Sequence, residues 1–226
     1  MYSQSVELPS GDAIHLFVVG RIGTNCYAYA SGDSCMVVDP GASGGQIAAE
    51  LLAKGLKVKL VVATHGHHDH VCGVKALLEA CPAPFLVGER DAWRVTQALE
   101  ISSHAFGKMA SATSEEQDAP EPDRTLAEGD VLEVGTARFR VMETPGHTEG
   151  GIVLVGEGSA EGIAFVGDTL FPGSCGRTDL LGGDHDTIIR SLSRMGREIA
   201  PDTMLLCGHG SSTTMARELA TNPFVR

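Results

Sequence analysis

The sequence predicts an α/β fold, and three observations support this class. Apolar runs of strand length recur along the chain and are bounded by glycine and polar residues. Segments with the apolar spacing of amphipathic helices lie between several of these runs. Polar loops flanked by glycine directly follow buried runs, and open α/β proteins bind ligands in such loops at the carboxyl ends of strands.

The first half of the chain is predicted to open with an antiparallel arrangement and to continue with alternating strands and helices. The turn Ser31-Gly32-Asp33 joins two runs as a hairpin, and Gly55 is the expected C-cap of the first helix. The strands are expected at residues 14–19, 26–30, 35–38, 58–63 and 85–87. The helices are expected at residues 46–54, 74–80 and 89–101.

The second half is predicted to repeat this architecture, beginning with a hairpin around Gly135-Thr136. Its strands are expected at residues 131–134, 137–143, 152–155, 163–166 and 203–207. Its helices are expected at residues 186–199 and 214–220. No linker or low-complexity block interrupts the chain, so residues 1–226 are expected to form one domain.

Residues 102–122 break the pattern of the first half. Serines, alanines and an acidic run replace the periodic apolar residues there. Such composition predicts a mobile excursion, which is either a lid over a site or a solvated loop.

Composition argues against several classes of function. The chain has 226 residues, with 17 lysines and arginines against 29 aspartates and glutamates, and a net charge of −12. This acidic balance without a basic patch argues against a nucleic-acid partner. No apolar run approaches membrane-spanning length, and the N-terminus lacks the basic start and apolar stretch of a signal peptide. Six scattered cysteines without a C-x-x-C pair indicate reduced thiols in a cytoplasmic protein.

The segment Lys59–Val74 carries the densest chemistry of the chain. A short apolar run ends at Thr64, and metal-competent side chains fill five of the next six positions. They are His65, His67, His68, Asp69 and His70. Imidazoles and carboxylates are costly to bury unless they are paired or bound to a cation. A solvated histidine tract, such as a purification tag, lies at a terminus and follows no core strand. We therefore interpret this loop as a metal site.

Three more polar side chains lie in glycine-flanked loops further along the chain, namely His147, Asp168 and His209. Loops at the strand ends of one sheet layer converge in space, so these side chains are expected to join the first loop. The complete set is His65, His67, Asp69, His70, His147, Asp168 and His209. Five imidazoles and two carboxylates without a thiolate suit zinc, iron or manganese. Seven groups exceed one tetrahedral site and suffice for two divalent ions that share a bridging carboxylate.

The motif T-H-x-H-x-D-H, which is present at Thr64–His70, resembles the signature of the metallo-β-lactamase superfamily. The later His, Asp and His of that superfamily are matched in order by His147, Asp168 and His209. The stretch GDTLFPGSCGRTDL at 167–180 and the later CGHGSSTT look like the short, single-domain glyoxalase II-like hydrolases. The resemblance covers nearly the whole chain.

The resemblance implies a metallo-β-lactamase-like four-layer αβ/βα sandwich of two mixed sheets flanked by helices, with the site at one edge. It also implies a ligand set for each of two metal ions. The ligands of metal 1 would be His65, His67 and His147. The ligands of metal 2 would be Asp69, His70 and His209, with Asp168 as the bridge. Asp39 matches a carboxylate that lies near the metals in this family.

The activity that the resemblance implies is hydrolysis of small thioesters, of the hydroxyacylglutathione hydrolase (glyoxalase II) type. A hydroxide between two metal ions, expected to be zinc, would attack the thioester carbonyl. Asp69 would hold metal 2 and orient this nucleophile. The expected partner is a small-molecule thioester, with no nucleic acid and no membrane. The pattern leaves open the metal identity, the acyl group, the use of glutathione as the thiol carrier and the oligomeric state.

The alternatives differ in how they use metal. A persulfide dioxygenase shares the motif matched by Cys175–Asp179 and uses a single iron held by two histidines and one aspartate. A lactonase or β-lactamase activity is a further alternative. A metal-binding protein without catalysis would be expected to have lost ligands, and none is lost here.

Five residues near these motifs have simpler expected roles. His68 falls outside the ligand pattern and is expected on the surface of its loop. Arg177 and Asp179 are spaced to pair within one loop, and Cys175 is expected to be a packed thiol. Trp93 is expected in the core.

Overall fold

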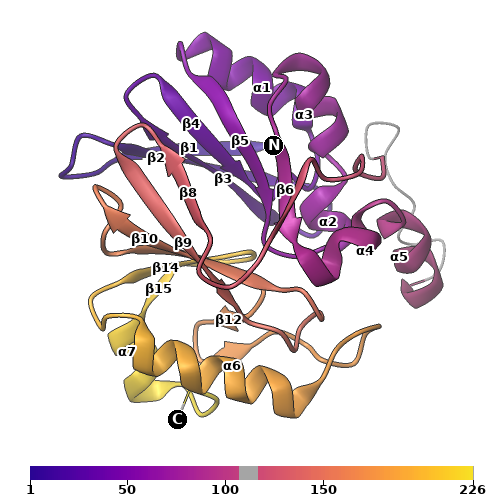
Figure 1. Ribbon diagram of the computed structural model, residues 1–226, viewed down its shortest axis with the longest axis vertical. Coiled ribbons are helices and arrows are strands. Elements are labelled where there is room, and N and C mark those ends of the chain that lie inside the picture. Colours follow the sequence, from indigo (N-terminus) through magenta and orange to yellow (C-terminus); the bar gives the residue numbers. More distant parts are fainter. Residues whose placement is uncertain (107–116, 226) are drawn as a thin grey trace.

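The computed structural model describes residues 1–106 and 117–225. Two sheets pack face to face, and helices cover the outer face of each (Figure 1). The order of layers is therefore helix, sheet, sheet, helix, which confirms the predicted four-layer αβ/βα sandwich. Both sheets contain parallel and antiparallel pairs.

The first sheet takes up most of the first half of the chain. Its strands, in the order in which they neighbour one another, are β1 (Tyr2–Glu7), β2 (Ala13–Val19), β3 (Thr24–Ser31), β4 (Ser34–Val38), β5 (Lys57–Ala63), β6 (Phe85–Gly88) and β7 (Arg124–Leu126). The pairs from β1 to β4 are antiparallel, and those from β4 to β7 are parallel. Because β4 and β5 are parallel neighbours, their carboxyl ends lie side by side.

The second sheet has the order β15-β14-β11-β10-β9-β8. These strands are β8 (Val131–Val134), β9 (Ala137–Glu143), β10 (Ile152–Gly158), β11 (Ile163–Gly167), β14 (Met204–Cys207) and β15 (Thr213–Thr214). Only β11 and β14 are parallel neighbours, so their carboxyl ends also lie side by side. A separate hairpin joins β12 (Leu170–Phe171) to β13 (Ser174–Cys175).

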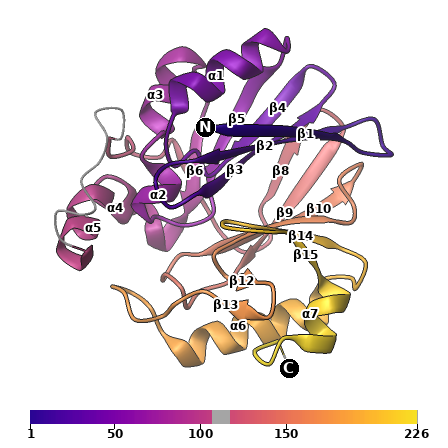
Figure 2. The same cartoon turned by 180° about the vertical axis from the view of Figure 1, so that it is seen from behind.

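Two pairs of helices form the outer layers. In Figures 1 and 2, α1 (Gly44–Ala53) and α3 (Val74–Ala80) cover the first sheet, and α6 (His185–Glu198) and α7 (Met215–Thr221) cover the second. The remaining helices lie beside the end of the first sheet. They are α2 (His68–Val71), a 3₁₀ turn (Glu89–Asp91), α4 (Ala92–Val95) and α5 (Ala98–Phe106).

Apolar side chains from both sheets form the core between them. Tyr29 packs edge-on against Phe139 with ring centroids 4.9 Å apart, and Phe139 lies 5.5 Å from Phe165. All three rings are fully buried, and aromatic pairs in these geometries are favourable beyond their buried area. The core therefore fixes the two sheets relative to each other, and with them the loops at the strand ends.

The first strand was not predicted from the sequence. β1 alternates polar and apolar residues weakly, and all six of its residues are exposed because it pairs only with β2 at the edge of the sheet. An edge strand without a buried face leaves no period-two apolar pattern to detect.

The helical segment predicted at residues 89–101 is confirmed but interrupted. The chain forms a 3₁₀ turn, then α4, then α5, which continues to Phe106. The prediction that Trp93 lies in the core is wrong, since this residue is 43% exposed. Arg94 and Val95 occupy the inward-facing positions of α4 instead.

The predicted mobile excursion at residues 102–122 is also wrong at both of its ends. Residues 102–106 belong to α5. On the other side, Gln117 donates its backbone N–H to the Cys72 carbonyl, and Ala119 donates to Val95. The Asp118 carboxylate accepts the Leu99 N–H at 2.8 Å, so this segment is tied to the core. Residues 107–116 lie outside the described residues.

All six cysteines lie among the described residues and none forms a disulfide, as the sequence predicted. Within residues 1–106 and 117–225, no helix combines the length and the apolar character needed to cross a bilayer.

Replacing Phe165 by alanine should lower the free energy of unfolding by about 3–5 kcal/mol, because a buried ring is lost and a cavity remains between the sheets. Urea denaturation of the metal-free protein measures this. Tyr2→Ala, on the exposed β1, is the control and should change stability by no more than about 0.5 kcal/mol. Equal losses for the two variants would contradict the assignment of the core.

Candidate metal centre

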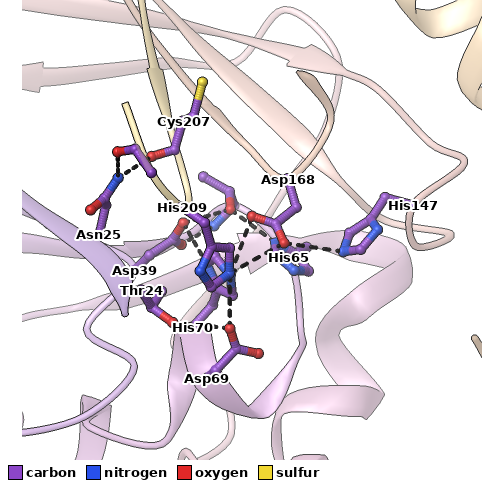
Figure 3. A network of polar contacts seen from close by, with 12 residues as sticks. Thr24, Asn25, Asp39, His65, Asp69, His70, His147, Asp168, Cys207 and His209 are labelled. Atoms are coloured by element: carbon purple, nitrogen blue, oxygen red, sulfur yellow. Dashed lines mark hydrogen bonds and ion pairs between the residues drawn. The ribbon is translucent and has the colours of Figure 1, made fainter. Parts of the chain in front are cut away.

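The seven side chains predicted as a metal site meet in one place. Figure 3 labels all of them except His67. The loops that carry them follow β5, β9, β11 and β14. Three groups each bring their ligand atoms within 4.8 Å of one another. The metal-1 set is His65, His67 and His147, the metal-2 set is Asp69, His70 and His209, and the third group is His65, His70 and Asp168.

The loop after β5 contributes residues to both sets because a short helix follows it. His65 and His67 precede this helix, and their rings lie 4.8 Å apart. His147 packs against both rings, with centroids 4.8 Å from His65 and 4.6 Å from His67. Helix α2 then turns Asp69 and His70 toward His209.

Asp168 lies between the two sets, as Figure 3 shows. Its Oδ2 atom lies 3.7 Å from His147 Nε2 and 3.5 Å from His209 Nε2. Its Oδ1 atom lies 3.5 Å from His70 Nε2. One carboxylate therefore faces both sets, which is the placement that a bridging ligand requires.

Several of these atoms are buried and have no hydrogen-bond partner. They are His65 Nε2, His67 Nε2, His147 Nε2 and Asp168 Oδ1. Buried polar atoms in native proteins almost always have a partner, and these four converge on one point of the structure. Divalent cations would satisfy them, so the residues present fit a two-metal site.

Two histidines are held in the tautomer that metal binding needs. The Nδ1 atom of His147 lies 2.7 Å from the Arg177 carbonyl oxygen, which only accepts, so Nδ1 carries the proton. The Nδ1 atom of His70 lies 3.0 Å from Asp39 Oδ2 and is fixed in the same way. The Nε2 lone pairs of both rings therefore face the centre, as in metal sites whose ligands are oriented by a carboxylate or a carbonyl.

Asp39 supports the site from the end of β4. Its carboxylate accepts the backbone N–H and the hydroxyl of Thr64, each at 2.7 Å, besides the His70 ring. The backbone of Asp39 has φ 55°, a left-handed conformation that aspartate tolerates better than most residues. The structure thus places Asp39 beside the ligands, where the resemblance expected it.

A second support, which was not predicted from the sequence, lies at the start of β3. Thr24 donates its hydroxyl to Asp69 Oδ2 at 3.0 Å. Asn25 donates its side-chain amide to the carbonyls of Cys207 and Gly210, on either side of His209. In the sequence, Thr24 and Asn25 are two polar residues ahead of an apolar run. Ordinary strand ends share this pattern, so it did not point to a role at the site.

The electrostatic surroundings of the two sets differ. Burial lowers the pKa of His65, His67 and His147, because imidazolium loses its hydration there, and the pKa of His67 falls to about 3. Burial also disfavours protonation of His70 and His209, but nearby carboxylates outweigh it and raise the pKa of both. Without metal, the two histidines of the metal-2 set therefore hold protons to higher pH than the three histidines of the metal-1 set.

The two carboxylates are ionised at neutral pH. Burial would raise the pKa of Asp69 and Asp168, but the His70 ring and its neighbours outweigh burial and lower the pKa of both groups. Each can therefore act as a ligand or as a hydrogen-bond acceptor.

A cavity of about 740 Å³ opens beside the ligands. Its floor includes His67, Asp69, His147, Asp168 and His209. Its walls are largely apolar and come from α5 and two loops. The apolar wall residues are Ile22, Ala98, Ile101, Ala105, Leu180 and Leu181. A small organic molecule can therefore reach the centre.

The structure also locates the neighbouring residues predicted from the sequence. Arg177 pairs with Asp179 through two hydrogen bonds of 2.7 and 2.8 Å, as predicted. His68 is partly buried and lies 3.6 Å from Asp69, outside the three ligand groups. Cys175 is partly buried in β13, and burial raises the pKa of its thiol, as expected of a packed residue.

Comparison with known proteins gives one family for this chain. The model of the metallo-beta-lactamase superfamily matches residues 19–220. An uncharacterized protein of Aquifex aeolicus is 39% identical over 93% of this chain and 96% of its own length. The hydroxyacylglutathione hydrolase GloC of Haemophilus influenzae is 30% identical over 84% of this chain and 86% of its own.

Two solved structures share the fold at similar identity. The B3 metallo-beta-lactamase BLEG-1 superposes with a TM-score of 0.83 and is 29% identical, covering 94% of this chain and 99% of its own. TTHA1623 in a di-iron-bound form has a TM-score of 0.80 and 32% identity, covering 92% and 98%.

Replacing Asp168 by alanine should weaken the binding of both metal ions, because its carboxylate faces both sets. Wild-type protein purified without chelators should hold close to two ions per chain by elemental analysis. Asp179→Asn is the control, since its carboxylate is exposed and pairs with Arg177, and it should retain both ions. A single ion in the wild type that His209→Ala leaves unchanged would contradict the two-metal model.

Acidification should release the metal ions, because histidine binds a metal only as the neutral imidazole, and protons compete for it increasingly as the pH falls below about 6.5. Dialysis at stepwise lower pH, followed by elemental analysis, measures the loss. A metal content that stays constant from about pH 8 to about pH 4 would contradict histidine ligation.

Proposed function

The chain belongs to the metallo-beta-lactamase superfamily, and we propose that it is a two-metal hydrolase of small thioesters of the hydroxyacylglutathione hydrolase type. The observation that carries the proposal is the position of Asp168, whose carboxylate faces both ligand sets at the floor of an open cavity. A site for two ions favours hydrolysis over chemistry that needs one ion with open positions.

Zinc is the proposed metal, and iron or manganese suits the same donors. The likeness to TTHA1623, solved in a di-iron-bound form, supports iron as an alternative. Bound ions would supply Lewis-acid chemistry, polarising the substrate carbonyl and making water more acidic. The seven residues of the two sets and the bridge would hold them.

Asp69 is the proposed catalytic residue of the chain itself. Its carboxylate lines the cavity, and its ionised state lets it accept a hydrogen bond from the attacking water. The Thr24 hydroxyl donates a hydrogen bond to Asp69 Oδ2 and so limits rotation of the carboxylate. Asp69 can therefore orient a water molecule toward a carbonyl carbon.

The cavity supports a small substrate with an apolar part. Ile22, Ile101 and Leu181 offer apolar contacts above the polar floor, so an acyl group can lie at the ligands while the thiol lies along the walls. Similarity to GloC supports a thioester as the bond that is cleaved. We propose S-D-lactoylglutathione or a simpler 2-hydroxyacyl thioester as the substrate, in a cytoplasmic setting and without a nucleic-acid or membrane partner.

The metal-loaded protein should release free thiol from S-D-lactoylglutathione, or from a simpler 2-hydroxyacyl thioester, under anaerobic conditions. A thiol reagent measures this product directly. Asp69→Asn should lower kcat by about 10²-fold, because the amide replaces one of the carboxylate oxygens that would hold metal 2 and orient the water. The metal content of this variant is measured in parallel, and the activity is compared per bound ion.

Two control assays test the alternatives. Oxygen uptake with glutathione persulfide should be negligible, and so should hydrolysis of a β-lactam. Oxygen uptake without anaerobic thioester cleavage would identify a persulfide dioxygenase, and β-lactam cleavage alone would favour the activity in the name of BLEG-1.

A further inference from the structure

A buried pair of opposite charges, Asp91 and Arg94, lies beside the metal-1 set, and Arg94 also lines the cavity. Neither was singled out from the sequence. Asp91 is fully buried, and Arg94 is 1% exposed. Arg94 Nε lies 3.7 Å from Asp91 Oδ1. Buried charges are costly, and removing one partner leaves the other uncompensated.

The Asp91 carboxylate joins the two loops that carry the metal-1 ligands. Its Oδ2 accepts the backbone N–H of Gly66, at 2.7 Å, and Gly66 lies between His65 and His67. Its Oδ1 accepts the backbone N–H of Gly150, at 2.9 Å, three residues after His147. Both oxygen atoms are thus used to hold loops that are far apart in the sequence.

Arg94 extends this support to a third loop. Its Nη2 donates to the Leu181 carbonyl at 3.0 Å, in the segment that also carries Arg177. The Arg177 carbonyl in turn fixes the His147 ring. The aliphatic part of Arg94 packs on Gly66 so closely that a Cβ atom there would lie 2.8–3.0 Å from it. Arg94 therefore fills the space behind the first ligand loop and neutralises Asp91.

The metal-2 set has a different support. Asp39 orients His70, Thr24 holds Asp69, and Asn25 holds the loop of His209. Among the hydrogen bonds of the described residues, those of Asp91 and Arg94 reach no residue of this set. The two sets still meet at Thr64, because Asp39 also accepts the Thr64 hydroxyl, which lies 3.1 Å from His65 Nδ1. The hydrogen bonds of the Asp91 carboxylate, by contrast, go to the metal-1 loops alone.

We propose that Asp91 and Arg94 are positioning residues for metal 1 alone, and that this pair sets the affinity of the metal-1 ion independently of metal 2. The proposal rests on the two-metal assignment made above, but not on the choice of substrate. Three imidazoles bind one ion tightly only when their loops hold a fixed separation, and the carboxylate is the link between those loops.

Asp91→Asn is the most conservative test. The amide keeps the shape of the carboxylate, but its NH₂ group faces one of the two backbone N–H groups, and the charge of Arg94 loses its partner. The variant is combined with His209→Ala, which leaves only the metal-1 ion, and with His147→Ala, which leaves only the metal-2 ion. Zinc affinity is measured in each background by competition with a chromophoric chelator.

The expected result is a loss of about tenfold or more in zinc affinity in the His209→Ala background. In the His147→Ala background the change should be less than about twofold. Equal losses in both backgrounds, or no loss in either, would overturn the proposal. If the double variants do not fold, a cobalt titration of Asp91→Asn alone should show one weakened step out of two.

Two further variants separate positioning from general destabilisation. Asp12→Asn is the matched control, because Asp12 is a buried aspartate that accepts the Tyr29 hydroxyl at 2.8 Å at the opposite end of β2 and β3. It should lower the unfolding temperature and leave both zinc affinities unchanged. Arg94→Lys, which keeps the charge, should retain more metal-1 affinity than Arg94→Met, and equal loss in these two would contradict the ion pair.

Discussion

The structure depends on holding seven metal-competent side chains against one another at one buried edge. His70 Nε2 and His209 Nε2 lie only 3.3 Å apart, and Asp168 presents its carboxylate to both sets. Without cations this arrangement leaves acceptor atoms without partners and gathers like charges, both of which cost free energy. Metal binding would remove these costs, so bound ions would contribute to the stability of the fold as well as to the proposed chemistry.

The fold achieves this crowding by packing two sheets against each other, so that ligand loops from both sheets meet. Parallel pairs at β4–β5 and at β11–β14 bring the ligand loops to one edge, and the aromatic core fixes the sheets that carry them. Glycine then permits the final approach. A Cβ atom at Gly208 would lie 2.7 Å from the His70 ring, and one at Gly41 would overlap the backbone of Asp69. Larger residues at these positions would push apart the loops that carry the ligands.

The sequence predicted the parts of this structure that leave a local pattern. The strands that end at Ala63 and Cys207 are apolar runs, and the ligands stand out because histidine and aspartate rarely crowd glycine-flanked loops. β1 was missed because an exposed edge strand carries no buried face. The supporting residues were missed for another reason. Asp91 acts on Gly150, 59 residues away, and such a contact exists only once both sheets have formed. Trp93 was assigned wrongly because Arg94 takes the inward position that a helical pattern gives to an aromatic residue.

Ligands and walls come from different parts of the chain, and this separation explains the range of proteins that share the fold. The ligands lie in loops at strand ends, where the sheets fix them, whereas the walls come from α5 and from the segment around Leu181. A change in the apolar wall side chains would alter which molecule reaches the centre without replacing a ligand. A hydroxyacylglutathione hydrolase and a B3 metallo-beta-lactamase can therefore resemble this chain to nearly the same degree. We expect substrate choice to follow the wall residues, and metal content to follow the strand-end loops together with the Asp91, Asp39 and Thr24 supports behind them.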